Sequence, residues 1–192
     1  MAIRHFDGIA RRAYQEIRSE IRTGDLLLAS GNYPVSHIIR HFSDSMFSHV
    51  GFVFPWNNRI LLLESVEDDG VRAVPLSQYV EDYECCGKGY DGRLFMARHK
   101  APISNEASER ILSKAADELN RKYDKEEIGR ILARVTLGLG HHGDNRAYIC
   151  SEFVDVCFQA AGIIFPRDDR GFIFPEHIAA DTNVTPLWEI AV

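Results

Sequence analysis

The sequence lacks any apolar run of about 18 residues, so we expect no membrane-spanning helix. Its first twenty residues, MAIRHFDGIARRAYQEIRSE, have no apolar stretch of the kind that a secretory signal needs. Positive charge is in the minority, because 22 Lys and Arg stand against 28 Asp and Glu and give a formal net charge of −6. This balance disfavours nucleic acid and anionic membranes as partners.

Cysteine is also scarce, with four residues in a chain of 192. None of the four has a CxxC spacing, and the adjacent Cys85 and Cys86 would form a disulfide only with strain. We therefore expect reduced thiols and a cytoplasmic location. The adjacent His141 and His142 have no further ligand at a metal-binding spacing, so we expect no metal site and no cofactor.

What the sequence does contain is typical of a single globular domain over residues 1–192, with 45% hydrophobic and 26% charged residues. Apolar residues recur at helical spacing near the start of the chain, which predicts an opening amphipathic helix. These residues are Phe6, Ile9, Ala10, Ala13, Ile17 and Ile21.

Strand-like runs fill most of the first half of the chain: TGDLLLAS, SHVGFVF, RILLLES, GVRAVPL and GRLFMARH. PVSHIIRHF predicts a short helix, and PWNN a hairpin. Further helices are predicted at about 104–121, at about 125–139 and within NRAYICSEFVDVCFQAAGI, where Gly162 is the cap. A turn at FPEHIAAD and a strand in VTPLWEI follow. Because strands gather before helices, the pattern favours an α+β fold.

Cys150 stands where the helix of NRAYICSEFVDVCFQAAGI begins, whereas Cys157 lies in its middle among apolar residues. Both are compatible with a small core residue, and we interpret Cys157 as one. At a helix start, however, the unpaired N–H groups and the helix dipole favour a thiolate and can bind an oxyanion. Glu152 opposes the thiolate. A reactive thiol also needs a base, usually histidine.

Among eight histidines, His49 is distinguished by its place on a strand among apolar residues, where an imidazole needs a partner. If PWNN is a four-residue loop, Phe54 lies opposite Arg59 and His49 faces Glu64. Directly opposed side chains have Cβ atoms about 4.5–5.5 Å apart, which is close enough for an imidazole–carboxylate hydrogen bond. The structural alternative is a core histidine paired with a carboxylate.

GDLLLAS, SHVGFVF, LLLESVEDDGV and YICSEFV follow one another along the chain. In this order, from about Gly24 to Ile178, they resemble the permuted papain-like amidases, the YiiX/YebB-like relatives of the NlpC-type cysteine peptidases. The resemblance implies a circularly permuted NlpC/papain-like fold, in which a small antiparallel sheet or partial barrel packs against helices. It divides the domain into an N-terminal helical extension, 1–23, and an amidase domain, 24–192.

In the permuted enzymes the histidine comes first, then a polar residue, then the cysteine, and this sequence has that order. The resemblance therefore implies Cys150 as nucleophile, His49 as base and Glu64 as third catalytic residue. It implies hydrolysis of an amide or ester through a thioester acyl-enzyme, on a small peptide, a cell-wall fragment or a lipid-like substrate. Residues that bind substrate are not identified, and the sequence does not indicate an oligomeric state.

Two other functions are compatible with the sequence. One is an acyltransferase of the lecithin:retinol acyltransferase-like type, which uses the same thioester. The other is a binding module that keeps the fold without turnover, which the intact Cys, His and Glu set disfavours. The segment 133–147, which holds His141 and His142 and three glycines, is either a plain surface loop or a cover for the site.

Overall fold

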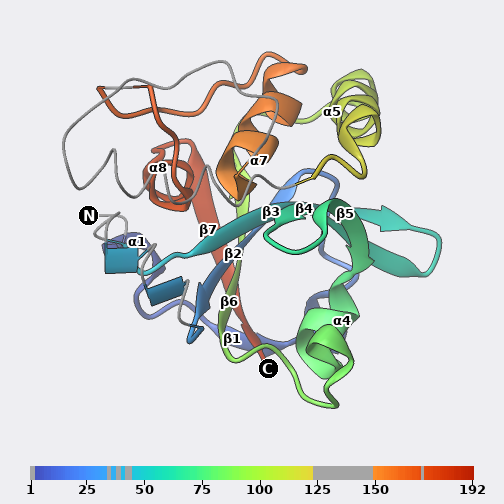
Figure 1. Ribbon diagram of the computed structural model, residues 1–192, viewed down its shortest axis with the longest axis vertical. Coiled ribbons are helices and arrows are strands. Elements are labelled where there is room, and N and C mark those ends of the chain that lie inside the picture. Colours follow the sequence, from blue (N-terminus) through green and yellow to red (C-terminus); the bar gives the residue numbers. More distant parts are fainter. Residues whose placement is uncertain (1–2, 34–35, 38–39, 42–44, 123–148, 170) are drawn as a thin grey trace.

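The computed structural model describes residues 3–33, 36–37, 40–41, 45–122, 149–169 and 171–192 (Figure 1). Within them, one seven-stranded sheet has the order β1-β7-β6-β2-β3-β4-β5. Neighbouring strands are antiparallel except for β1 and β7, which are parallel. The strands are β1 Arg11–Ala13, β2 Asp25–Gly31, β3 His49–Trp56, β4 Arg59–Val66, β5 Gly70–Pro75, β6 Gly92–His99 and β7 Val184–Ala191.

Helices cover both faces of this sheet. In Figure 1, α5, α7 and α8 lie above the strands and α4 lies below them. The helical elements are α1 Ile3–Phe6, α2 Tyr14–Ile17, α4 Leu76–Glu81, the 3-10 turn η1 Tyr83–Cys85, α5 Asn105–Glu118, α7 Cys150–Gln159 and α8 Pro175–Ala180. A sheet packed against helices confirms the predicted α+β class. No helix in the described ranges is long and apolar enough to cross a membrane.

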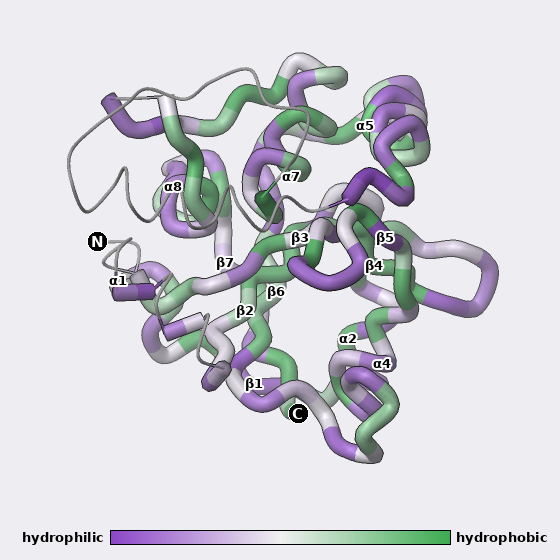
Figure 2. The backbone as a smooth tube through the Cα atoms, viewed as in Figure 1, coloured by the Kyte–Doolittle hydropathy of each residue, from purple (hydrophilic) through white to green (hydrophobic). Residues whose placement is uncertain are grey.

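The two faces of the sheet hold separate hydrophobic clusters. One joins Phe52 and Phe95 to Phe153 and Phe158 of α7, and the other joins Leu27 and Leu94 to residues of α2 and α4. All seven residues of β2 are buried, because this strand lies between β3 and β6 and is covered on both faces. The apolar central strands are visible in Figure 2. This double burial explains why DLLLASG has no polar alternation.

The N-terminal segment differs from the single amphipathic helix that the sequence predicts. Gly8 has a φ of +72°, which ends α1, and Arg11–Ala13 then pair with β7 in the parallel ladder. A short α2 follows. Phe6, Ile17 and Ile21 are buried as expected, whereas Ala10 and Ala13 are exposed. Residues Arg11–Ala13 form a strand although their apolar pattern favours a helix, because β7 provides backbone hydrogen-bond partners for them.

The β3–β4 hairpin is tighter than expected. Trp56 pairs with Arg59 and Phe54 with Leu61, so the loop has two residues and not four. Asn57 takes the left-handed conformation that such a loop needs, with φ of 53°. The register is therefore displaced by two residues from the predicted one. Because side chains alternate with a period of two, this displacement keeps His49 and Glu64 on the same face of the sheet.

Further outcomes concern the helices. FPEHIAAD, predicted as a turn, contains α8, and α4 and η1 were not predicted. Gly162 lies past the end of α7 with φ of +79°, as a cap requires. The helix predicted at 125–139 lies outside the described residues, and so does part of PVSHIIRHF.

Candidate active site

The helix α7 begins at Cys150, with Ile149 in extended conformation before it. Its first turn is oriented by Glu152, whose Oε2 accepts the backbone N–H of Ile149 at 3.1 Å. The carboxylate expected to oppose a thiolate is thus engaged with the backbone before the helix. Cys150 is 6% exposed, and its neighbour Ser151 anchors the turn by donating to the carbonyl of Ile173 at 2.8 Å.

His49 opens β3 and contacts both Cys150 and Glu64. Its Nε2 lies 2.7 Å from Glu64 Oε2. Because an ionised carboxylate only accepts hydrogen bonds, Nε2 carries the proton. A hydrogen bond also joins the imidazole to Cys150, which leaves Nδ1 to meet the thiol. Burial alone would lower the pKa of His49, but the hydrogen bonds to Cys150 and Glu64 outweigh it and raise the pKa to about 10.

Glu64 reaches His49 by a diagonal contact and not by direct opposition. Phe52 pairs with Leu63 in the antiparallel β3–β4 ladder, so the next residue of β4, Glu64, faces Gly51. Gly51 is two residues from His49 along β3. A Cβ at Gly51 would lie 3.2 Å from that of Glu64 and 2.8 Å from the carbonyl oxygen of Leu63. The glycine in SHVGFVF therefore makes room for the base of the Glu64 side chain and for the adjacent strand. Diagonal neighbours of this kind are within reach of long side chains.

Two further side chains hold Glu64, which is 0% exposed. Arg72 Nε donates to Oε1 at 2.8 Å, and the hydroxyl of Tyr79 donates to Oε2 at 2.7 Å. Burial would raise the pKa of Glu64, but the hydrogen bond to His49 and the charges of His49 and Arg72 lower it. Sequence reasoning missed both donors. The turn at Asp68-Asp69-Gly70 was the available signal, because a tight hairpin there puts Arg72 opposite Glu64.

The remaining thiols, and those other histidines that the structure describes, have different surroundings. Cys157 is fully buried in the core, as expected, and burial raises its pKa. Cys85 and Cys86 are exposed free thiols. Among the other described histidines, His37 meets Arg40 at 2.8 Å, and His177 accepts the N–H of Phe174 at 3.0 Å.

Cys150 and His49 line one cavity of about 490 Å³. Tyr33, Tyr79, Tyr83 and Tyr90 form an aromatic part of its wall, and the acidic Glu67 and Asp68 belong to another part. Such a volume is in the range of pockets that bind small molecules. No cluster of three or more His, Cys, Asp or Glu that could hold a metal occurs among the residues that the structure describes. His141, His142 and the segment 133–147 lie outside them.

Residues 20–172 match the family described as permuted papain-like amidase enzyme, YaeF/YiiX, C92 family. The chain belongs to this family. The predicted resemblance is confirmed, and with it the general character of a papain-like amidase.

A solved structure shows the same fold as this permuted papain-like amidase. It is described as the metalloprotein yiiX from Escherichia coli O157:H7, and it is 18% identical in sequence. The match has a TM-score of 0.65 and covers 90% of this chain and 99% of the other. A search among curated proteins found no match.

Proposed function

We propose that the protein is a cysteine-dependent amidase, with Cys150 as nucleophile, His49 as base and Glu64 as the residue that orients His49. The observation that carries the proposal is the continuous hydrogen-bonded chain from Cys150 through His49 to Glu64 at the wall of one cavity. Membership of an amidase family supports the same chemistry. Neither Cys157 nor the exposed Cys85 and Cys86 has a comparable partner.

The reaction follows from the charges along this chain. The Cys150 thiol gives its proton to Nδ1 of His49, and the resulting imidazolium is supported by Glu64 through Nε2. The thiolate attacks the carbonyl carbon of an amide or ester, and the imidazolium returns the proton to the leaving amine or alcohol. Water, activated by the neutral imidazole, then cleaves the thioester and restores the thiol.

The start of α7 supplies the expected oxyanion site. Backbone N–H groups in the first turn of a helix have no partner within the helix, and they point toward incoming negative charge. Cys150 is the first residue of α7, so its own N–H lies next to the attacked carbonyl. The N-terminus of α7 thus stabilises the negative charge of both the Cys150 thiolate and the tetrahedral intermediate.

The cavity favours small substrates. About 490 Å³ accommodates a modified amino acid, a short peptide or cell-wall fragment, or the polar end of a lipid-like amide. An extended polypeptide would need an open groove. We therefore propose a small peptide, a cell-wall fragment or a lipid-like amide as substrate.

The test uses p-nitrophenyl acetate as an activated ester and intact-mass spectrometry as readout. We expect the wild-type protein to gain one acetyl group on Cys150 and to lose it again, whereas Cys150→Ala gains none at that position. Cys157→Ala, altered in the same helix, is the matched control and should still acylate. Loss of the acetyl group to water indicates a hydrolase, and transfer to an added amine at a higher rate indicates an acyltransferase. A wild-type protein that never acylates at Cys150 would contradict the proposal.

A further inference from the structure

Glu64 is held by more donors than a residue that only orients a histidine requires. Its carboxylate is fully buried, and three elements each send one donor to it: His49 from β3, Arg72 from β5 and Tyr79 from α4. A buried carboxylate whose only partner is a neutral imidazole takes up a proton, because desolvation penalises its charge. His49 is neutral during part of the proposed reaction. Another group must therefore keep Glu64 ionised in that part.

Arg72 is placed for this role. It is the direct cross-strand partner of Glu64 in the β4–β5 ladder, and its Nε meets Oε1, the oxygen that His49 does not use. Its guanidinium is oriented from the other side by Asp69, which accepts from Nη1 at 2.5 Å. The charge of an arginine does not depend on pH in the working range. Arg72 thus offers Glu64 a permanent counter-ion while His49 gains and loses its proton.

Tyr79 shares an oxygen with His49. Its hydroxyl donates to Oε2, the atom that also accepts from His49 Nε2. The ring is 2% exposed and packs against Tyr83 and Tyr90, with centroids 4.8 Å and 5.5 Å away. Tyr79 therefore fixes the position of Oε2 and draws part of its negative charge away from the imidazole.

We propose that Arg72 and Tyr79 are positioning residues that set the basicity of His49 through Glu64. They hold the carboxylate in place and ionised, and they compete with His49 for its charge. The imidazole is then a weaker base than it would be beside an unshared carboxylate, so it can release its proton to the leaving group. The catalytic meaning of this role rests on the proposed function, but the effect on His49 does not.

Titratable groups from several elements surround His49 and Glu64. His49 faces Cys150 of α7 and Glu64 of β4, and Glu64 faces His49, Arg72 and Tyr79. Tyr83 and Tyr90 lie farther away and also feel the charge of Glu64. Because Cys150 interacts directly with His49, the test is made in a Cys150→Ala background, where the thiol is absent.

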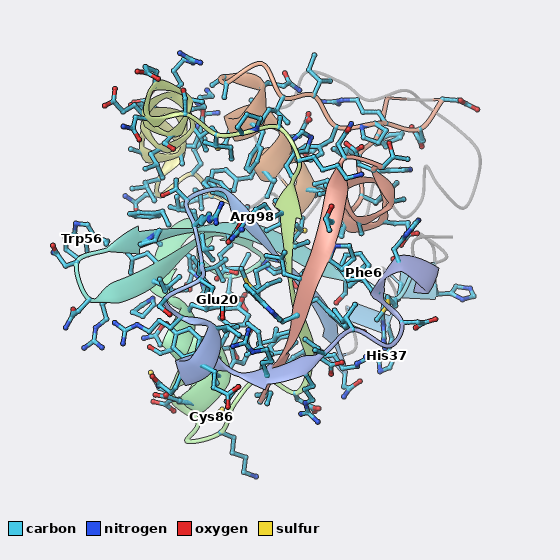
Figure 3. The ribbon with its side chains drawn as sticks, turned by 180° about the vertical axis from the view of Figure 1, so that it is seen from behind. Phe6, Glu20, His37, Trp56, Cys86 and Arg98 are labelled. Carbon is cyan, nitrogen blue, oxygen red and sulfur yellow. The ribbon has the colours of Figure 1, made fainter. Side chains whose placement is uncertain are left out.

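The same protein contains a matched control. Arg98 donates from Nε and Nη2 to the buried carboxylate of Asp25, at 2.6 Å and 2.8 Å, and also to the carbonyl of Glu20. Asp25 is 1% exposed and has no histidine partner. Arg98 and Glu20 lie close together in Figure 3. Arg98→Gln therefore removes a comparable ion pair without touching His49.

The experiment follows the titration of His49 by NMR of ¹⁵N-histidine-labelled protein, with the resonance assigned by its absence in His49→Gln. Arg72→Gln should move the midpoint to higher pH by about one unit, because a positive charge near the pair is lost. Tyr79→Phe should move it in the same direction by less. Arg72→Lys keeps the charge, so its His49 midpoint should stay nearer to that of the Cys150→Ala protein. Arg98→Gln should leave the His49 midpoint unchanged.

A midpoint in Arg72→Gln that equals that of Arg98→Gln, or lies below it, would overturn the inference. If Arg72→Gln does not fold, the Tyr79→Phe variant provides the test. An unchanged His49 midpoint in Tyr79→Phe would then overturn the inference. In proteins that retain Cys150, loss of the acetyl group from Cys150 should need a higher pH in Arg72→Gln than in wild type. If the NMR shifts occur but wild-type Cys150 never acylates, the coupling stands and the proposed amidase function fails.

Discussion

At the scale of single residues, Cys150 and Cys157 lie in one helix and meet opposite surroundings. Cys150 begins α7, hydrogen-bonds to His49 and lines the cavity, whereas Cys157 is enclosed by the core. Only a thiolate reacts with iodoacetamide, and burial raises the pKa of Cys157. We expect Cys150 to be alkylated at neutral pH at least about a hundredfold faster, as peptide mass spectrometry would show. Equal rates at the two positions would contradict the assignment.

Removal of the charge of Glu64 tests its proposed role. Glu64→Gln keeps the shape but takes away the support for the imidazolium, so acylation of Cys150 should slow by roughly 10²- to 10⁴-fold. The substitution also leaves Arg72 beside a neutral side chain, and we expect a lower melting temperature. Asp25→Asn, which breaks the equivalent pair with Arg98, is the control for stability. Asp25→Asn should lower the melting temperature, while its acylation rate stays within a few-fold of wild type. If Glu64→Gln acylates as fast as Asp25→Asn, Glu64 has no role in the mechanism.

At the scale of elements, the turn of the β3–β4 hairpin sets the register that brings His49 near Glu64. Asn57 has a left-handed φ of 53°, which asparagine tolerates and alanine does not. Asn57→Ala should therefore destabilise the protein by about 1 kcal/mol, and Asn57→Gly should leave stability nearly unchanged. The neighbouring Asn58→Ala is the control. Trp56 is 58% exposed at the tip of the hairpin (Figure 3), so the turn receives little support from packing. Thermal unfolding decides between the three variants.

The β3–β4 hairpin shows which parts of the structure could be predicted from the sequence and which could not. The pairing of His49 with Glu64 was anticipated because both lie on strands joined by PWNN, and a displacement of two residues does not change the face. The loop length was wrong, since Pro55 and Trp56 belong to β3 and the turn contains only the two asparagines. Arg11–Ala13 were assigned to a helix because their partner β7 lies at the other end of the chain. Tyr79 comes from a six-residue helix too short to show a clear period.

At the scale of the whole molecule, the site lies where elements from both halves of the chain meet. The first half supplies His49, Glu64 and Arg72 on three consecutive strands, and the second supplies Cys150. The helix that begins with Cys150 is fixed to β3 by Phe52, whose ring stacks on Phe153 and meets Phe158 edge-on. Asp155 of the same helix accepts from Arg167 and so ties the following loop to it. The position of the thiol relative to His49 is thus a property of the folded domain, and unfolding should abolish it.

The dependence of stability on pH follows from His49. Its pKa is raised from 6.5 to about 10 in the folded protein, so the folded state binds this proton more tightly than the unfolded state. The contribution is fully present below about pH 6.5 and is lost as the pH rises toward 10. The pKa of Glu64 is lowered, so its contribution is lost only on the acid side of its ordinary value of 4.5. Between pH 6.5 and 9 the stability difference between wild type and His49→Gln should therefore shrink steadily. Urea unfolding at fixed pH values measures it, and His5→Gln, at an exposed position, is the control. A difference that stays constant over this range would show that His49 does not hold its proton as the contacts with Cys150 and Glu64 require.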